Sequence, residues 1–99
     1  MSFDDVVHQK VRFGALVILS ETDRADFGYL RTSLDVTDGN LSTHLKALES
    51  AGYVQITKEF VANKPRTWVE ITPSGRSAFG AEIDLLRSII RDKDRRARA

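Results

Sequence analysis

The stretch TDGNLSTHLKALESAGYV, residues 37–54, predicts a helix with two very different faces. Its apolar residues recur at spacings of four and three, which places them on one inward-facing stripe, and they are Leu41, Leu45 and Leu48. Thr37 is a favourable N-cap residue, and Gly52 suits the left-handed conformation that ends many helices. We therefore expect a helix over residues 37–51.

The opposite face of this helix carries short hydrogen-bonding side chains where an ordinary solvated face would carry salt-bridged ones. Its outward positions are Asp38, Gly39, Asn40, Ser42, Thr43 and Lys46, with His44 toward one flank. Small residues let a backbone come close to another molecule. Asparagine bonds adenine bidentately, serine and threonine reach bases or phosphates, and lysine reaches guanine or the backbone. This face therefore suits a DNA major groove; a solvated face that binds nothing is the alternative.

Apolar spacing predicts four further elements around this helix. Dense apolar residues indicate a helix over residues 5–20 that is buried on two sides. The segment ETDRAD then reads as a polar turn, and Asp26 is expected to cap a second helix over residues 26–35. YVQITKEF and TWVEIT alternate, which indicates a hairpin over residues 53–72. Thr72-Pro73 is a typical helix start and opens a last helix over residues 73–92.

The order helix, helix, helix, hairpin, helix predicts a mainly helical α+β fold, the winged helix-turn-helix. It would comprise three helices, a two-stranded β-hairpin wing and a C-terminal dimerisation helix in a single domain over residues 1–99, because a chain of this length supports one modest core. An isolated hairpin is marginally stable, so the wing must pack on the helices. Residues 93–99 form a basic tail, expected as a frayed and solvated helix end, with phosphate contact or a solubilising role as alternatives.

The expected hairpin offers three cations, which are Lys58, Lys64 and Arg66. The segment VANKPR is expected to form the loop at the tip, where Pro65 limits the freedom of the chain. An arginine held there suits insertion into a narrow, electronegative minor groove. A merely solvated tip is the alternative. Trp68, which shares a strand face with Glu70, is expected to pack on the wing or on a neighbouring helix, with the wall of a ligand pocket as the alternative.

The first and last helices carry more apolar surface than a small domain is expected to cover alone. The candidate interface residues are Val7, Val11, Phe79, Ile83, Leu86 and Ile90. We expect a homodimer in which these helices of two chains pack together. Twofold symmetry would then present two recognition helices to half-sites roughly 34 Å apart. The alternative is that these residues close the chain's own core.

Two parts of the sequence resemble known families of small winged-helix repressors. The first resembles the recognition segment of ArsR-type regulators, matched here by Thr37, Leu41, Ser42, His44-Leu45, Leu48 and Ala51-Gly52-Tyr53-Val54. The second, KPRTWVEITPSGRSAF, is similar to a compact MarR-like family with a Lys/Arg-Pro-Arg-Thr wing and a Leu-Thr-Pro-x-Gly-Arg helix start. The resemblance covers residues 11–90, implies a DNA-binding fold and is uninformative about an effector.

Residue types exclude several other classes of site. There is no cysteine, and His8 and His44 are too few and too far apart for a metal site, so neither a metal nor a cofactor is expected. No glycine-rich phosphate loop and no nucleophile–base pair occur, so we expect no catalytic residues and no enzyme. The longest apolar run, Ala15–Leu19, is too short to span a membrane, and no signal pattern opens the chain. A cytoplasmic location follows by default.

The sequence therefore favours a dimeric, sequence-specific transcriptional regulator that binds double-stranded DNA, and among such regulators a repressor. The net charge of +1 predicts few phosphate contacts and a moderate dependence of binding on salt. The main alternative is a winged-helix protein–protein interaction module that does not touch DNA. An unknown small-molecule effector is compatible with the sequence, as is control by protein level or by a partner.

Overall fold

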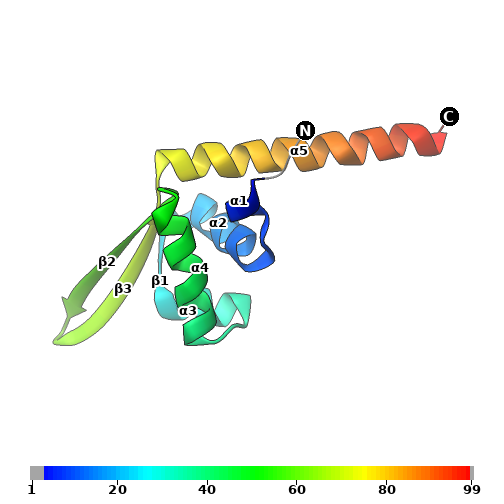
Figure 1. The fold of residues 1–99 in the computed structure, drawn as a ribbon. Coiled ribbons are helices and arrows are strands. Elements are labelled where there is room, and N and C mark those ends of the chain that lie inside the picture. Colours follow the sequence, from blue (N-terminus) through cyan, green and yellow to red (C-terminus); the bar gives the residue numbers. More distant parts are fainter. Residues whose placement is uncertain (1–3, 99) are drawn as a thin grey trace.

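The computed structural model describes residues 4–98, without the side chains of residues 8 and 98, and shows a helical body, a protruding β-ribbon and one long helix (Figure 1). The elements in chain order are α1 (Asp5–His8), α2 (Lys10–Thr22), β1 (Arg24–Asp26), α3 (Phe27–Leu34), α4 (Asp38–Ser50), β2 (Val54–Val61), β3 (Lys64–Ile71) and α5 (Pro73–Arg98). The molecule is elongated, with extents of 62 × 25 × 21 Å, because α5 runs past the body. This is the predicted winged-helix fold.

The core confirms the leucine stripe of α4. Leu41, Leu45 and Leu48 are each at most 1% exposed, and they pack with buried residues of every other part of the body. The largest fully buried side chains besides these three are Val7, Leu16, Leu19, Leu30 and Val69. The outward face of α4 is therefore fixed by which side its leucines bury.

The single helix expected over residues 5–20 is two helices. Gln9 has an extended backbone (φ −61°, ψ 136°), and its side chain accepts hydrogen bonds from the N–H groups of Val11 and Arg12, so it starts α2 anew. Asp4 caps α1 and also accepts a hydrogen bond from the Tyr53 hydroxyl at 2.7 Å. That bond is the main cause of the lowered pKa of Asp4. The break lets α1 turn back toward the end of α4.

The sheet has three strands where the sequence indicated a two-stranded hairpin. The ETDRAD segment is not a simple turn, because α2 continues through Thr22 and Arg24–Asp26 forms β1. Asp23 reverses the chain with a φ of 66°. β1 then pairs antiparallel with β3, and the strand order is β1-β3-β2. Ala25 is the one buried residue of β1, which anchors the strand on the core.

The hairpin lies within the predicted residues 53–72, but its strands are longer and its turn is tighter than expected. β2 and β3 pair without interruption from Val54 opposite Ile71 to Val61 opposite Lys64. Ala62 and Asn63 both have positive φ, 52° and 64°, as in the two-residue turns that match the twist of a hairpin. The predicted VANKPR loop is therefore a two-residue turn, and its last residues belong to β3. Pro65 is tolerated there because β1 does not extend beside that part of β3.

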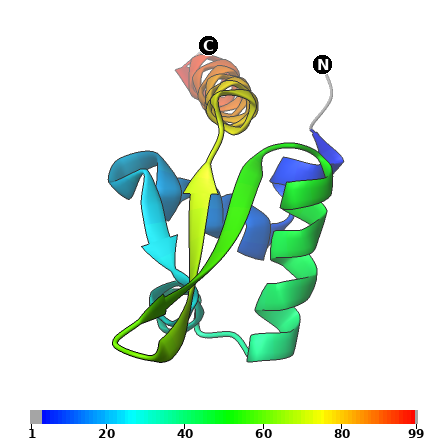
Figure 2. The ribbon, with the colours of Figure 1, turned by 90° about the vertical axis from the view of Figure 1, so that its left-hand side faces the viewer.

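The C-terminal helix is longer than the predicted 73–92. α5 has 26 residues and takes in the basic tail as far as Arg98, so the tail is helical. The threonine of the predicted Thr72-Pro73 start accepts a hydrogen bond from the N–H of Gly75 and donates one to the carbonyl of Gly52. Seen end-on in Figure 2, α5 lies at the edge of the molecule opposite the wing tip. In the described part of the chain, no helix is both long and apolar enough to cross a membrane.

Candidate nucleic-acid interface

One edge of the molecule brings together the N-terminus of α4, helix α3 and the tip of the wing (Figure 2). α3 and α4 are joined by a short turn in which Asp35 takes the left-handed conformation, with a φ of 54°. The N–H of Asp35 donates to the carbonyls of Arg31 and Thr32 in the last turn of α3. This pair of helices is a helix-turn-helix.

The first turn of α4 has the predicted cap. Thr37 accepts a hydrogen bond from the N–H of Asn40 at 3.1 Å through its side-chain oxygen. Asp38 is paired with Arg31 of α3 at 2.8 Å. Both side chains are largely exposed, so the pair contributes little to stability, but it offsets a carboxylate that would repel phosphate. Arg31 is a cation of this edge that the sequence patterns do not indicate, because it depends on how α3 meets α4.

The side of α4 away from the core is open. Gly39, Asn40, Thr43 and Lys46 are exposed, and the Thr43 hydroxyl donates to the carbonyl of Gly39 at 3.0 Å. Apart from its chain neighbours and the adjacent helix backbone, a Cβ added at Gly39 would meet no atom of the described residues within 4 Å. The surface next to Gly39 and Thr43 is therefore low and free for a close approach by another molecule.

His44 lies on the flank of α4 and is half-buried. Burial lowers its pKa, and the guanidinium of Arg12 on α2 lowers it further, so the imidazole is neutral at pH 7. It can donate or accept a hydrogen bond but carries no charge to a phosphate. Among the residues that the structure describes, no group of three or more His, Cys, Asp or Glu could hold a metal ion.

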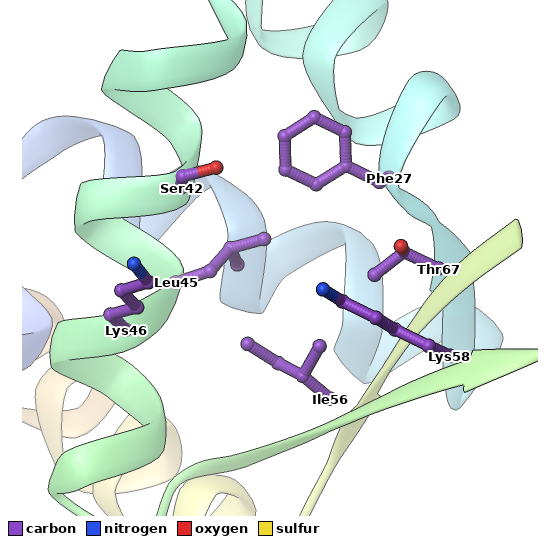
Figure 3. A pocket seen from close by; sticks show the side chains of 7 residues that line it. All are labelled: Phe27, Ser42, Leu45, Lys46, Ile56, Lys58 and Thr67. Atoms are coloured by element: carbon purple, nitrogen blue, oxygen red, sulfur yellow. The ribbon is translucent and has the colours of Figure 1, made fainter. Parts of the chain in front are cut away.

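A groove of about 290 Å³ separates α4 from the wing (Figure 3). Leu45, Ile56 and Phe27 contribute its apolar lining. Its polar residues are Ser42 and Lys46 of α4 and Lys58 and Thr67 of the wing. In Figure 3 the Lys58 side chain points from the wing into the groove. Ammonium and hydroxyl groups on both walls suit a phosphate strand that passes between helix and wing.

The other two cations of the wing, Lys64 and Arg66, belong to strand β3 and not to the expected tip loop. Lys64 adjoins the two-residue turn, whereas Arg66 sits further back in β3, opposite Glu59. The Arg66 guanidinium lies 5.7 Å from the centre of the Trp68 ring, and that of Arg24 lies 4.1 Å from it. Trp68 thus packs within the wing and β1, where cation–π contacts hold both arginines near the ring.

The candidate dimer residues differ in exposure. Val7 is fully buried in the chain's own core, where its side chain already has partners. Phe79 packs on Phe13 of α2 with ring centroids 5.4 Å apart. Exposure then rises along α5, and Ile90 is 66% exposed. The remaining candidates, Val11, Ile83 and Leu86, are half-buried. The later turns of α5 therefore present apolar surface that this chain does not cover.

Comparisons with known proteins find one matching family model, one relative and several similar solved structures. A family model described as a winged helix DNA-binding domain matches residues 11–90. An uncharacterized protein of Methanocaldococcus jannaschii is 39% identical over 77 residues, which is 78% of this chain and 79% of the relative. A transcriptional regulator homologue from Pyrococcus horikoshii OT3 has a TM-score of 0.85 at 34% identity, over 90% of this chain and 88% of that one. A transcriptional regulator assigned to the MarR family, from Enterococcus faecalis V583, has a TM-score of 0.80 and covers 100% of this chain and 97% of its own. It is 22% identical in sequence, so this likeness shows the fold alone.

Proposed function

Because the chain belongs to the winged helix DNA-binding domain family, we propose that it is a dimeric, sequence-specific repressor that acts in the cytoplasm. Repression would follow from occupancy of an operator and requires no chemical step. The observation that carries this proposal is the open N-terminal half of α4, which shares one edge of the molecule with the wing.

In the proposed complex α4 enters the major groove with its N-terminal half. Asn40 and Thr43 contact base edges, and the backbone at Gly39 approaches closely. The DNA backbone between the major and minor grooves passes over Ser42, Lys46 and Lys58, which line the protein's own groove between α4 and the wing. Further contacts come from Thr37, Asp38 and His44 at the helix and from Lys64 and Arg66 on the wing. Arg31, held beside α4 by Asp38, adds a phosphate contact.

The proposed dimer forms through the first and last helices. Uncovered apolar surface on α5 supports this, because Ile89 and Ile90 are 41% and 66% exposed in the single chain. Val11, Phe79, Ile83 and Leu86 would complete the interface, and twofold symmetry would set two copies of α4 roughly 34 Å apart.

The experiment that tests this function is selection of bound duplexes from a random pool, followed by titration of the selected duplex in salt. We expect a palindromic preferred site and a moderate loss of affinity as salt increases, since the net charge is only +1. Equal binding to selected and scrambled duplexes at modest ionic strength would contradict the proposal.

Asn40→Ala is expected to change base preference. Loss of one bidentate base contact should weaken binding to the selected duplex by roughly 1–3 kcal/mol and leave binding to scrambled duplexes nearly unchanged. Fluorescence anisotropy on both duplexes measures the difference. Ser50→Ala, at the far end of the same helix, is the control and should leave both affinities intact. An equal loss on both duplexes would show that Asn40 does not read a base.

Gly39→Ala should raise the stability of the fold and lower the affinity for DNA. Alanine is the better helix former by roughly 0.5–1 kcal/mol, and no described atom lies within 4 Å of the added Cβ, so the melting temperature should rise. The same methyl group would keep the DNA from approaching α4, so affinity for the selected duplex should fall. Thermal unfolding and anisotropy on one preparation measure both. Unchanged affinity would mean that the backbone at Gly39 is not close to DNA.

A further inference from the structure

The wing carries an apolar cluster near its tip that the chain leaves uncovered. Phe60 is 79% exposed. Pro65, which is also exposed, lies directly opposite Phe60 in the β2–β3 ladder. Opposed residues of an antiparallel pair point to the same side, so Phe60 and Pro65 stand together. Clustered apolar groups held in water mark a surface that gains from contact with a partner.

This cluster continues the surface that begins at α4. Side chains alternate along a strand, so Ile56, Lys58 and Phe60 lie on one face of β2. Ile56 and Lys58 line the groove against α4. Phe60 is the next residue on that face toward the tip, and the tip lies on the same edge of the molecule as the start of α4 (Figure 2). A partner seated on α4 would therefore meet Phe60 as well.

The wing presents this aromatic ring on a stiff support. The β2–β3 ladder is continuous up to the two-residue turn at Ala62 and Asn63. Pro65 fixes its own backbone torsion beside Phe60. Little conformational freedom remains to be lost when such a ribbon docks, so its contacts count more fully toward affinity.

Charge around the cluster indicates which partner fits. Lys58 lies on the same face of the wing as Phe60 and Pro65. The exposed Lys64 and Arg66 lie on the other face, together with one acidic residue, Glu59. An excess of cations suits a polyanion better than an apolar protein surface. Phenylalanine and proline are both among the side chains that wedge between base pairs from the minor groove.

We propose that Phe60, backed by Pro65, enters the minor groove beside the site read by α4 and partly unstacks one base-pair step. The inference rests on the proposed function, because it needs α4 seated on DNA. Pyrimidine–purine steps kink most easily, so the selected site should carry a TA or CA step in the flank that the wing reaches. The protein would then bend its DNA and favour flexible flanks at positions that α4 does not touch.

The experiment uses the full chain and the duplex recovered by selection, with 2-aminopurine at the flanking step and a pair of dyes on the duplex ends. Wild-type protein should raise both the 2-aminopurine fluorescence and the energy transfer between the dyes. Phe60→Ala should abolish both signals and weaken binding roughly tenfold, whereas Phe60→Leu should keep most of each. Val61→Ala is the matched control, because Val61 is also exposed but points to the other face of the wing, and it should retain both signals.

Circular dichroism should show an unchanged fold for every variant, because Phe60 is exposed in the free chain. Wild-type signals that persist in Phe60→Ala would overturn the wedge while DNA binding stands. Specific binding by the wild type without either signal would overturn it too. If the wild type prefers no duplex, the proposed function itself fails, and the wedge fails with it.

Discussion

Gly75→Ala should lower the free energy of unfolding by about 3 kcal/mol, at the upper end of the usual cost of overpacking. For a domain of this size the melting temperature should fall by roughly 12–24 °C. A Cβ at Gly75 would lie 2.1 Å from the carbonyl oxygen of Tyr53 and 3.0 Å from a side-chain carbon of Ile71. The nearer atom belongs to the backbone, so no rotation of a side chain can make room.

The surrounding hydrogen bonds prevent the two segments from moving apart. The Thr72 N–H donates to the same Tyr53 carbonyl at 3.0 Å. The Thr72 hydroxyl donates to Gly52 at 2.6 Å and accepts from the N–H of Gly75 at 3.0 Å. Moving α5 outward together with Thr72 would lengthen the bonds to Tyr53 and Gly52, and moving it without Thr72 would lengthen the bond from Gly75. The glycine of the Thr-Pro-x-Gly-Arg motif is thus required by close packing of backbone on backbone.

Gly80→Ala is the matched control for this prediction. Gly80 lies in the same helix, and no atom in the described part of the chain falls within 4 Å of an added Cβ. This variant should gain roughly 0.5–1 kcal/mol, because alanine favours the helix over glycine. Urea unfolding followed by circular dichroism compares the two variants. Equal stability of Gly75→Ala and Gly80→Ala would contradict the close contact at Tyr53.

Ile90→Asp should convert the proposed dimer into a monomer and weaken binding to a palindromic duplex about a hundredfold. A carboxylate buried in an apolar interface without a partner is strongly unfavourable. Ile90 is 66% exposed in the single chain, so its replacement should leave the fold intact. The loss on DNA follows because two linked recognition helices bind as one bivalent unit, and separated chains do not. Analytical ultracentrifugation and anisotropy measure the two effects.

Ala81→Asp provides the control for the new charge. Ala81 is exposed and lies nine positions before Ile90, which is two and a half helical turns and so the opposite side of α5. Its replacement should leave both the dimer and the DNA affinity unchanged. A dimer that survives Ile90→Asp would show that two chains do not meet at this part of α5.

The parts of the fold that follow from local spacing could be predicted from the sequence. The cap at Thr37, the buried stripe of α4 and the glycine at its end depend on residues only a few positions apart. The strand β1 could not be predicted, because it has three residues with a single buried side chain, Ala25, and exists only by pairing with β3. The break at Gln9 depends on a side chain that caps the helix after it, for which the apolar pattern gives no signal.

In the candidate site too, features set by neighbouring residues could be predicted from the sequence, and contacts between different elements could not. Residues of one helix face could be assigned from the sequence, and the structure places Gly39, Asn40 and Thr43 on the open side of α4. The pairing of Arg31 with Asp38 joins two helices, so spacing within either helix cannot predict it. Phe60 could have been found, because the alternation of Val54 and Ile56 continues through Lys58 to Phe60 after the core has ended. The two-residue turn could not be predicted, because Ala62-Asn63 lacks the glycine usual in such turns.

α5 is about 39 Å long, and a single residue, Thr72, joins it to the last residue of β3. Thr72 is held on both sides: its N–H and hydroxyl donate to Tyr53 and Gly52 in the turn before β2, and its hydroxyl accepts from the N–H of Gly75 in α5. The orientation of α5 is therefore coupled to that of the wing through Thr72. In the proposed dimer, a molecule that changed the angle between the two copies of α5 would therefore move each wing relative to the DNA.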